Sequence, residues 1–225
     1  MSGPRSIRLL VSICNAKCIA AAVGAVFLQS SFSLAYELNR AEVTENNGVF
    51  QIVVSATLDA PAGYIRQVLT DYRNIYRLNS SIVETEIIDR CHRDGTRIRT
   101  KILVCASVFC REVERVEAVR ALDSGNLQAR IVPEQSEFRS GLANWKITPT
   151  GYGSELEYNA TVEPDFFIPP VVGVPVIRSS LKAEFIATVA RIEKIASINA
   201  ERYGSEEHAF ANADVNKTDM PCSRD

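Results

Sequence analysis

The chain has 225 residues, of which 46% are hydrophobic and 23% are charged, with 25 basic and 27 acidic residues and a net charge of −2. This composition is that of a globular protein with enough apolar side chains for a core, and the length suits one domain with short extra segments. The acidic balance argues against nucleic acid as the main partner, because phosphate binding needs a basic surface.

The first 35 residues have the pattern of a removable export signal. They carry basic residues and no acidic one, and an apolar run follows at 18–28. Small side chains at Ser33 and Ala35 predict cleavage between Ala35 and Tyr36. The apolar run is shorter than the roughly 20 residues that a membrane span needs, so an uncleaved anchor helix is the less favoured alternative. We therefore expect an exported protein, periplasmic or secreted, with a bacterial type of signal peptide.

Cleavage would remove three basic residues and change the net charge from −2 to −5. This acidic mature chain argues against strong adhesion to anionic lipid headgroups. Residues 36–47 are expected to be an N-terminal linker.

The cysteines fit an oxidising compartment. Cys105 and Cys110 bracket a short loop, and a hairpin there would bring them to disulfide distance. The alternative is a pair of small buried apolar side chains. Cys91 and Cys222 have no evident partner, and the absence of a CxxC motif argues against a zinc site.

The pattern from residue 48 onward begins with a strand and two short helices. Apolar and polar residues alternate over 50–58, which predicts a half-buried strand. Asp59 and Pro61 then have the positions of a helix N-cap and first turn. A second short helix is predicted around Ile75 and Tyr76.

A series of strands in meander order follows. Turn residues and alternating apolar positions place them at 82–89, 96–105, 110–122, 127–132, 138–147 and 156–162. Gly141, inside one of these strands, predicts a β-bulge.

An apolar segment with three prolines, 166–175, precedes the last helix and is expected to be neither a long helix nor a central strand. An apolar stripe then predicts a long C-terminal helix; its members are Ile177, Leu181, Phe185, Val189, Ile192 and Ile195. Residues 199–225 are polar and are expected to be a disordered tail.

This order predicts an α+β fold in one domain over 48–198. Short connections are satisfied by one curved antiparallel sheet wrapped around the long C-terminal helix, with the two short helices after the first strand. Such an arrangement leaves a space between sheet and helix that side chains or a ligand can occupy.

The chain resembles the START-like, or helix-grip, superfamily, and most nearly its polyketide cyclase/dehydrase and coenzyme Q-binding branch. The resemblance lies in the helix start at 60–62 with 68–72, the passage 75–88, the strand of Trp145, and the segment 166–170. It implies a deep apolar cavity between sheet and C-terminal helix that holds lipids, quinones, sterols or polyketides. It also implies that most members bind or transfer their ligand and that a minority catalyse.

Candidate cavity residues are apolar or aromatic side chains of the predicted sheet, loop and helix; they are Tyr72, Tyr76, Phe138, Trp145, Tyr158, Phe166, Phe167, Leu181 and Phe185. For the aromatic members the alternative is ordinary core packing. The loop 166–174 is either a ligand gate, with transient membrane contact, or a packed plug.

Charged strand residues offer a polar group for the cavity only if one of them points inward. Arg99 and Glu112 are the candidates, and the alternative for both is a solvent-exposed, charge-paired outer face. The two histidines, His92 and His208, have no evident partner, so a histidine-dependent catalytic or metal site is not expected.

The leading hypothesis is an exported, monomeric carrier or binding protein for a hydrophobic small molecule or lipid, of quinone-, fatty-acid- or polyketide-like type, with no cofactor. The alternatives are a cyclase or dehydratase acting in the same cavity, and a protein-interaction module that docks through the apolar loop.

Overall fold

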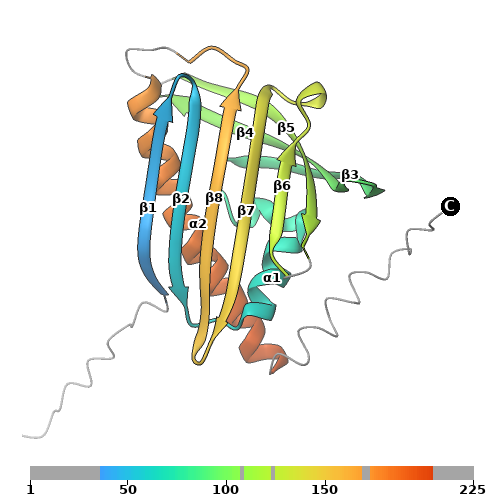
Figure 1. The fold of residues 1–225 in the computed structure, drawn as a ribbon, viewed down its shortest axis with the longest axis vertical. Coiled ribbons are helices and arrows are strands. Elements are labelled where there is room, and N and C mark those ends of the chain that lie inside the picture. The colour runs from blue at the N-terminus through green and yellow to red at the C-terminus, as the bar shows by residue number, and fades with distance from the viewer. Residues whose placement is uncertain (1–35, 107–108, 123–124, 169–172, 205–225) are drawn as a thin grey trace, which may run out of the picture. The chain divides into compact units, whose positions relative to one another are not determined.

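The computed structural model describes residues 36–106, 109–122, 125–168 and 173–204, which form one antiparallel sheet and the helices packed on it (Figure 1). The predicted signal peptide and most of the predicted tail lie outside these residues. No helix within the described part is both long and apolar enough to cross a membrane.

The sheet has eight strands in the order β1-β2-β8-β7-β6-β5-β4-β3. Their bounds are β1 (Tyr36–Asn46), β2 (Val49–Leu58), β3 (Ile82–His92), β4 (Gly95–Ala106), β5 (Phe109–Ala121), β6 (Leu127–Ile131), β7 (Phe138–Thr150) and β8 (Gly153–Pro164). The helices are α1 (Ala62–Thr70), the 3-10 helices η1 (Tyr72–Arg77) and η2 (Pro133–Gln135), and α2 (Gly173–Tyr203). Helix α2 runs across one face of the sheet (Figure 1). The predicted helix-grip fold is confirmed.

The prediction of a linker at 36–47 is wrong, because most of this segment is strand β1. Its alternation is weak because β1 is an edge strand that pairs only with β2, so most of its side chains face solvent. A tight turn joins the two strands. Its residues Asn47 and Gly48 have φ values of 51° and 85°, the conformation that Asn-Gly hairpin turns require.

Two smaller predictions also need correction. Helix α2 continues to Tyr203, past the expected end of the domain at 198. The irregularity in β7 lies between Phe138 and Ser140, whereas Gly141 pairs regularly with Val162. A Cβ at Gly141 would lie 2.3 Å from Cδ1 of Ile131, so glycine is needed there for close approach rather than for a bulge.

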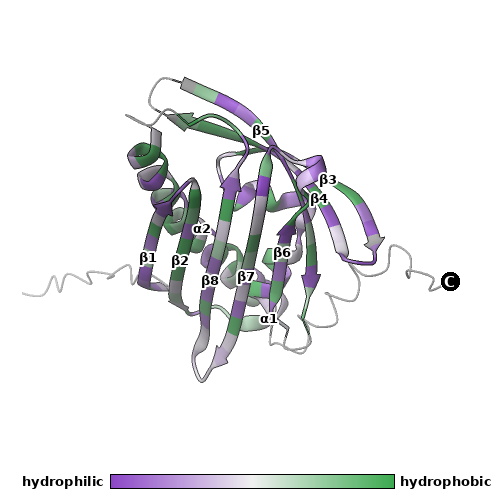
Figure 2. Ribbon diagram, turned by 45° about the horizontal axis from the view of Figure 1, so that its top comes forward, coloured by the Kyte–Doolittle hydropathy of each residue, from purple (hydrophilic) through white to green (hydrophobic). Residues whose placement is uncertain are grey.

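The face of the sheet toward α2, called here the inner face, carries the apolar positions. In β2 the inner residues Phe50, Ile52, Val54, Ala56 and Leu58 are all buried, and Figure 2 shows the hydrophobic and hydrophilic residues alternating along the strands. Burial of these apolar side chains is the main stabilising contribution to the fold, at about 25 cal/mol per Å² removed from water.

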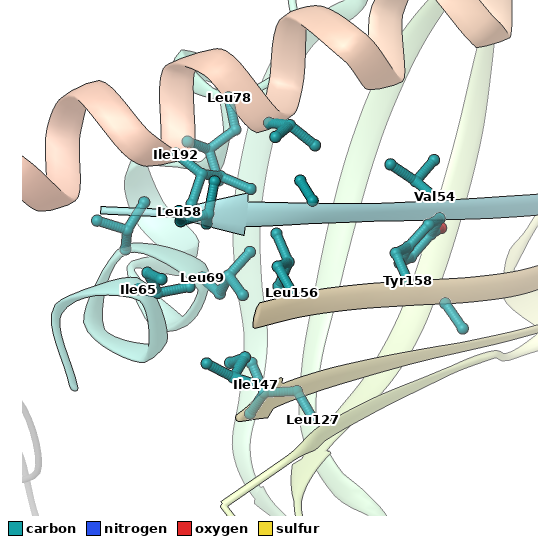
Figure 3. Packing of buried hydrophobic residues seen from close by; sticks show 14 of the residues in the cluster. Val54, Leu58, Ile65, Leu69, Leu78, Leu127, Ile147, Leu156, Tyr158 and Ile192 are labelled. Carbon is teal, nitrogen blue, oxygen red and sulfur yellow. The ribbon is translucent and has the colours of Figure 1, made fainter. Parts of the chain in front are cut away.

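One end of the inner face is filled by helices. Figure 3 shows Leu58 beneath Ile192 and Leu78, with Leu156 and Ile147 continuing the cluster along the sheet. Ile192 is fully buried. This packing occupies the end of the sheet next to α1, and the other end of the inner face is packed differently.

Polar contacts hold α2 above the sheet. The buried carboxylate of Glu193 accepts a hydrogen bond from the backbone N–H of Ala60 at 3.2 Å. The hydroxyl of Thr188 and the guanidinium of Arg191 both donate to the carbonyl of Leu78 at 2.9 Å. These bonds fix the height and direction of α2 and thereby the space beneath its N-terminal half.

Candidate functional site: an apolar cavity under α2

A cavity of about 390 Å³ lies between the inner face of the sheet and the first half of α2. The sheet wall is mainly apolar and comes from five strands; its apolar residues include Phe50, Ile52, Ile102, Val104, Phe138, Tyr158 and Val162. The helix wall is formed by Ile177, Leu181 and Phe185. The volume lies within the range of small-molecule sites, about 300–1,000 Å³. The space that the fold predicts is therefore an open cavity and is not filled by side chains.

Three aromatic rings in mutual contact separate the cavity from the packed end of the core. The Trp145 and Tyr158 ring centroids lie 4.1 Å apart, and those of Tyr158 and Phe185 lie 4.9 Å apart. Tyr158 is thus held between strand β7 and helix α2. Burial raises the pKa of its hydroxyl, and the negative charge of Glu117 adds to this shift, so the hydroxyl stays protonated at neutral pH.

The segment after β8 contributes one aromatic residue to the cavity and one to the surface. Phe166 lines the cavity, packs edge to face on Phe138 with centroids 5.6 Å apart, and carries the guanidinium of Arg111 over its ring at 5.4 Å. Phe167 is 80% exposed. Residues 169–172 of the predicted gate loop lie outside the described residues.

A carboxylate with all its partners in place lies at the edge of the cavity. Glu184 of α2 accepts hydrogen bonds from the backbone N–H of Ser80 at 2.6 Å, from the Ser80 hydroxyl at 2.9 Å, and from Arg191 at 2.7 Å. Burial raises the pKa of Glu184, but the bonds from Arg191 and Ser80 outweigh it and hold the pKa below its ordinary value. This contact ties α2 to the loop before β3.

A charged pair on β5 faces the inner side of the sheet. Arg115 lies opposite Thr100 in the register and Glu117 lies opposite Ile98, and both partners on β4 are buried inner-face residues. The Nε atom of Arg115 and the Oε2 atom of Glu117 are 3.1 Å apart. Arg115 lines the cavity. This pair was not among the site residues predicted from the sequence.

The two polar candidates predicted from sequence lie on the outer face. Arg99 alternates with the inner residues of β4, and its Nη1 donates to Glu86 at 2.8 Å. Glu112 is exposed, and it alternates along β5 with the inner residues Val113 and Arg115. The prediction that one of them points inward is wrong, and the alternative of a charged, solvent-exposed outer face is correct.

The structure brings five of the nine candidate cavity residues together at the cavity wall; they are Phe138, Tyr158, Phe166, Leu181 and Phe185. The other four lie elsewhere. Trp145 lies behind Tyr158, and Tyr76 and Phe167 are exposed. Tyr72 is partly buried outside the cavity lining, where desolvation raises its pKa to about 12. A role in ligand binding stays a prediction for all nine.

The predicted disulfide is present. Cys105 and Cys110 pair directly across the β4–β5 hairpin with their sulfur atoms 2.07 Å apart. Cys105 also belongs to the cavity lining. The bond therefore closes the hairpin next to the site.

Comparison with known proteins supports the same architecture. The family model described as "Polyketide cyclase / dehydrase and lipid transport" matches residues 49–196. No curated protein matches the chain.

Among solved structures, the STAR-related lipid transfer protein from Xanthomonas axonopodis superposes with a TM-score of 0.50 at 13% identity, over 72% of this chain and 99% of that one. The di-domain ARO/CYC StfQ from the steffimycin biosynthetic pathway superposes with a TM-score of 0.51 at 12% identity, over 68% of this chain and 52% of that one. At these identities the likeness concerns the fold alone.

Proposed function

We propose, from the premise that this chain belongs to the polyketide cyclase / dehydrase and lipid transport family, that it is an exported carrier for a hydrophobic small molecule or lipid. The family supports a role in hydrophobic ligand binding or cyclase-type chemistry, and carriage is the more specific choice made here. A quinone-, fatty-acid- or polyketide-like ligand would suit the apolar walls.

The observation that carries this proposal is the cavity of about 390 Å³ under α2. Most of its lining is aliphatic or aromatic, so a ligand is stabilised mainly by removal of its apolar surface from water. Among the lining residues that the structure describes, Glu184 already has hydrogen-bond partners for both oxygens. The site therefore favours binding over acid–base chemistry at that carboxylate.

Export is supported by the Cys105–Cys110 disulfide, which is of a kind that persists in oxidising compartments. The described strands all lie after residue 35, so cleavage after Ala35 would remove none of them. Mass measurement of the protein from the periplasm or medium should give a chain that starts at Tyr36. Recovery of the uncleaved chain in the cell would contradict export.

The carrier function is tested by extracting the purified protein with organic solvent and identifying bound compounds by mass spectrometry. We expect one class of apolar compound in near-stoichiometric amount with the protein. A protein that carries no such compound, and takes none up from a total lipid extract of its host, would refute the proposal.

A cyclase-type enzyme is the second candidate, and one specific observation favours it. The protonated Tyr158 hydroxyl and the Arg115 guanidinium both face the inner side of the sheet, where they could polarise a substrate carbonyl. Chemical change in a bound polyketide-like compound, lost in Y158F, would support this role. Recovery of the compound unchanged would support carriage.

A further inference from the structure

We infer that Arg115 receives the polar end of the ligand and that its ion pair with Glu117 selects an uncharged, oxygen-bearing head group over a carboxylate. This inference rests on the proposed function, since it concerns the ligand of the same cavity. The ligand would be an uncharged, oxygen-bearing apolar compound, and Arg115 would be the residue that distinguishes it from a carboxylate.

Arg115 and Glu117 both lie on the inner face of β5. The Arg115 side chain is 24% exposed and the Glu117 side chain is 17% exposed. Arg115 forms part of the cavity wall, whereas Glu117 is not among the lining residues. An entering ligand therefore meets the guanidinium before the carboxylate.

A second feature of the pair is the set of N–H donors on Arg115. A guanidinium has five N–H donors, of which the Nε atom faces Glu117 at 3.1 Å. This Nε atom is buried and has no hydrogen bond of good geometry, and within the described residues no side chain or backbone oxygen accepts a bond from the other two nitrogens. The mostly apolar wall supplies few acceptors. A ligand oxygen would satisfy donors that the protein leaves unmatched.

Glu184, in the same cavity, is a charged residue whose hydrogen bonds are already made within the protein. Its two oxygens receive three hydrogen bonds from Ser80 and Arg191. It has no comparable unused capacity. The other polar lining residues, Asn79, Ser80, Ser81 and Ser180, are uncharged, so Arg115 is the strongest hydrogen-bond donor that the described lining offers to the polar end of a ligand.

A third feature is the charge of the pair. Arg115 and Glu117 together are neutral, so an uncharged carbonyl or hydroxyl group adds no net charge to a site of low dielectric. A carboxylate would leave a net charge of −1 beside Glu117, and burial of an uncompensated charge is strongly unfavourable. The Tyr158 hydroxyl, which burial keeps protonated, is a second donor on the same face of the sheet.

The test uses two probes of matched shape, 2-tridecanone and dodecanoate. Both have an undecyl chain on a carbonyl carbon. The remaining group on that carbon is a methyl group in 2-tridecanone and a negatively charged oxygen in dodecanoate. Binding is followed by the fluorescence of Trp145, the only tryptophan of the chain, whose ring contacts that of the cavity residue Tyr158. Thermal denaturation of each variant shows that it is folded.

The wild-type protein should bind 2-tridecanone at least about tenfold more tightly than dodecanoate, because the carboxylate would be buried without compensation of its charge. E117Q keeps the size of the side chain and leaves Arg115 unneutralised, so the preference should move toward dodecanoate by about tenfold or more. The paired variant R115M/E117L removes both charges without leaving either one unpaired. It should lose about 10- to 100-fold in affinity for 2-tridecanone.

Equal affinities for the two probes in the wild-type protein, with a ratio that E117Q leaves unchanged, would overturn this inference and leave the carrier proposal intact. Failure of the folded wild-type protein to bind either probe would overturn both.

Discussion

Glu193 is the clearest point at which to test how α2 is held over the sheet. Its side chain is 2% exposed, and its carboxylate accepts hydrogen bonds from Ala60 N–H at 3.2 Å and from the Ser197 hydroxyl at 2.6 Å. Burial raises its pKa above the ordinary value of 4.5, although the bonds from Ser197 and Ala60 oppose the shift. The carboxylate thus carries a desolvation penalty that an amide would avoid.

The two substitutions E193Q and E193A should act in opposite ways. The amide oxygen of Gln can still accept the bond from Ala60, and the amide nitrogen can donate to Ser197, so E193Q should be at least as stable as the wild-type protein at pH 7. E193A leaves the buried Ala60 N–H without its acceptor, which costs about 1–3 kcal/mol.

The pH dependence follows from the direction of the pKa shift. Because the folded pKa of Glu193 lies above its unfolded value, the folded state binds the proton more tightly. The contribution of Glu193 to stability is therefore fully present below the unfolded pKa and is lost as the pH rises through the folded pKa.

Urea denaturation of the three proteins between pH 4 and pH 8 measures this effect. The stability of E193Q relative to the wild-type protein should increase with pH. Should E193Q be as destabilised as E193A at pH 7, with a difference that is constant across the range, the carboxylate charge would be needed in the fold and the reasoning would be wrong.

Two further predictions concern the backbone and the disulfide. G153A should be destabilised by more than about 1 kcal/mol, because Gly153 has a φ of +150° and a Cβ there would lie 2.1 Å from the carbonyl oxygen of Leu58. Thermal denaturation measures the loss, with G151A as the matched control, because no atom lies within 4 Å of a Cβ at that position. Similar melting temperatures for the two variants would contradict this. C105A/C110A should lose about 2 kcal/mol of unfolding free energy in non-reducing buffer, as expected for the short loop that the bond closes. In dithiothreitol the variant should be as stable as the wild-type protein. A loss that persists in dithiothreitol would mean that packing of the cysteine side chains, and not the disulfide, is responsible.

The fold could be predicted from the sequence where apolar periodicity was strong. The alternation of β2 and the stripe of α2 each depend on neighbouring residues, and the structure has these elements where they were expected. The first helix is also present, but the prediction of Asp59 as its N-cap is wrong, because α1 begins at Ala62 with Pro61 at the N-cap position. Strand β1 was missed because an edge strand with mostly exposed side chains shows little alternation; the signal that remained was the Asn47-Gly48 turn.

The polar part of the site could not be predicted for a related reason. In β5 the inner positions hold Arg115 and Glu117, whereas Val116 on the outer face is fully buried. Its backbone is hydrogen-bonded to the Ser136 hydroxyl, in the segment after η2 that lies alongside β5 at that point. Apolar residues therefore mark both faces of this strand, and alternation alone does not indicate which side of β5 faces the cavity.

The central claim, that the space under α2 holds the ligand, is tested most directly by the amount of native apolar compound that co-purifies with two double variants. V104W/L181W narrows the cavity from the sheet and from the helix, and V83W/I88W adds the same bulk at exposed positions outside the lining. We predict that V83W/I88W retains the wild-type amount of bound compound and that folded V104W/L181W carries less than a tenth of it. Equal amounts in both variants would contradict the claim and place the ligand elsewhere.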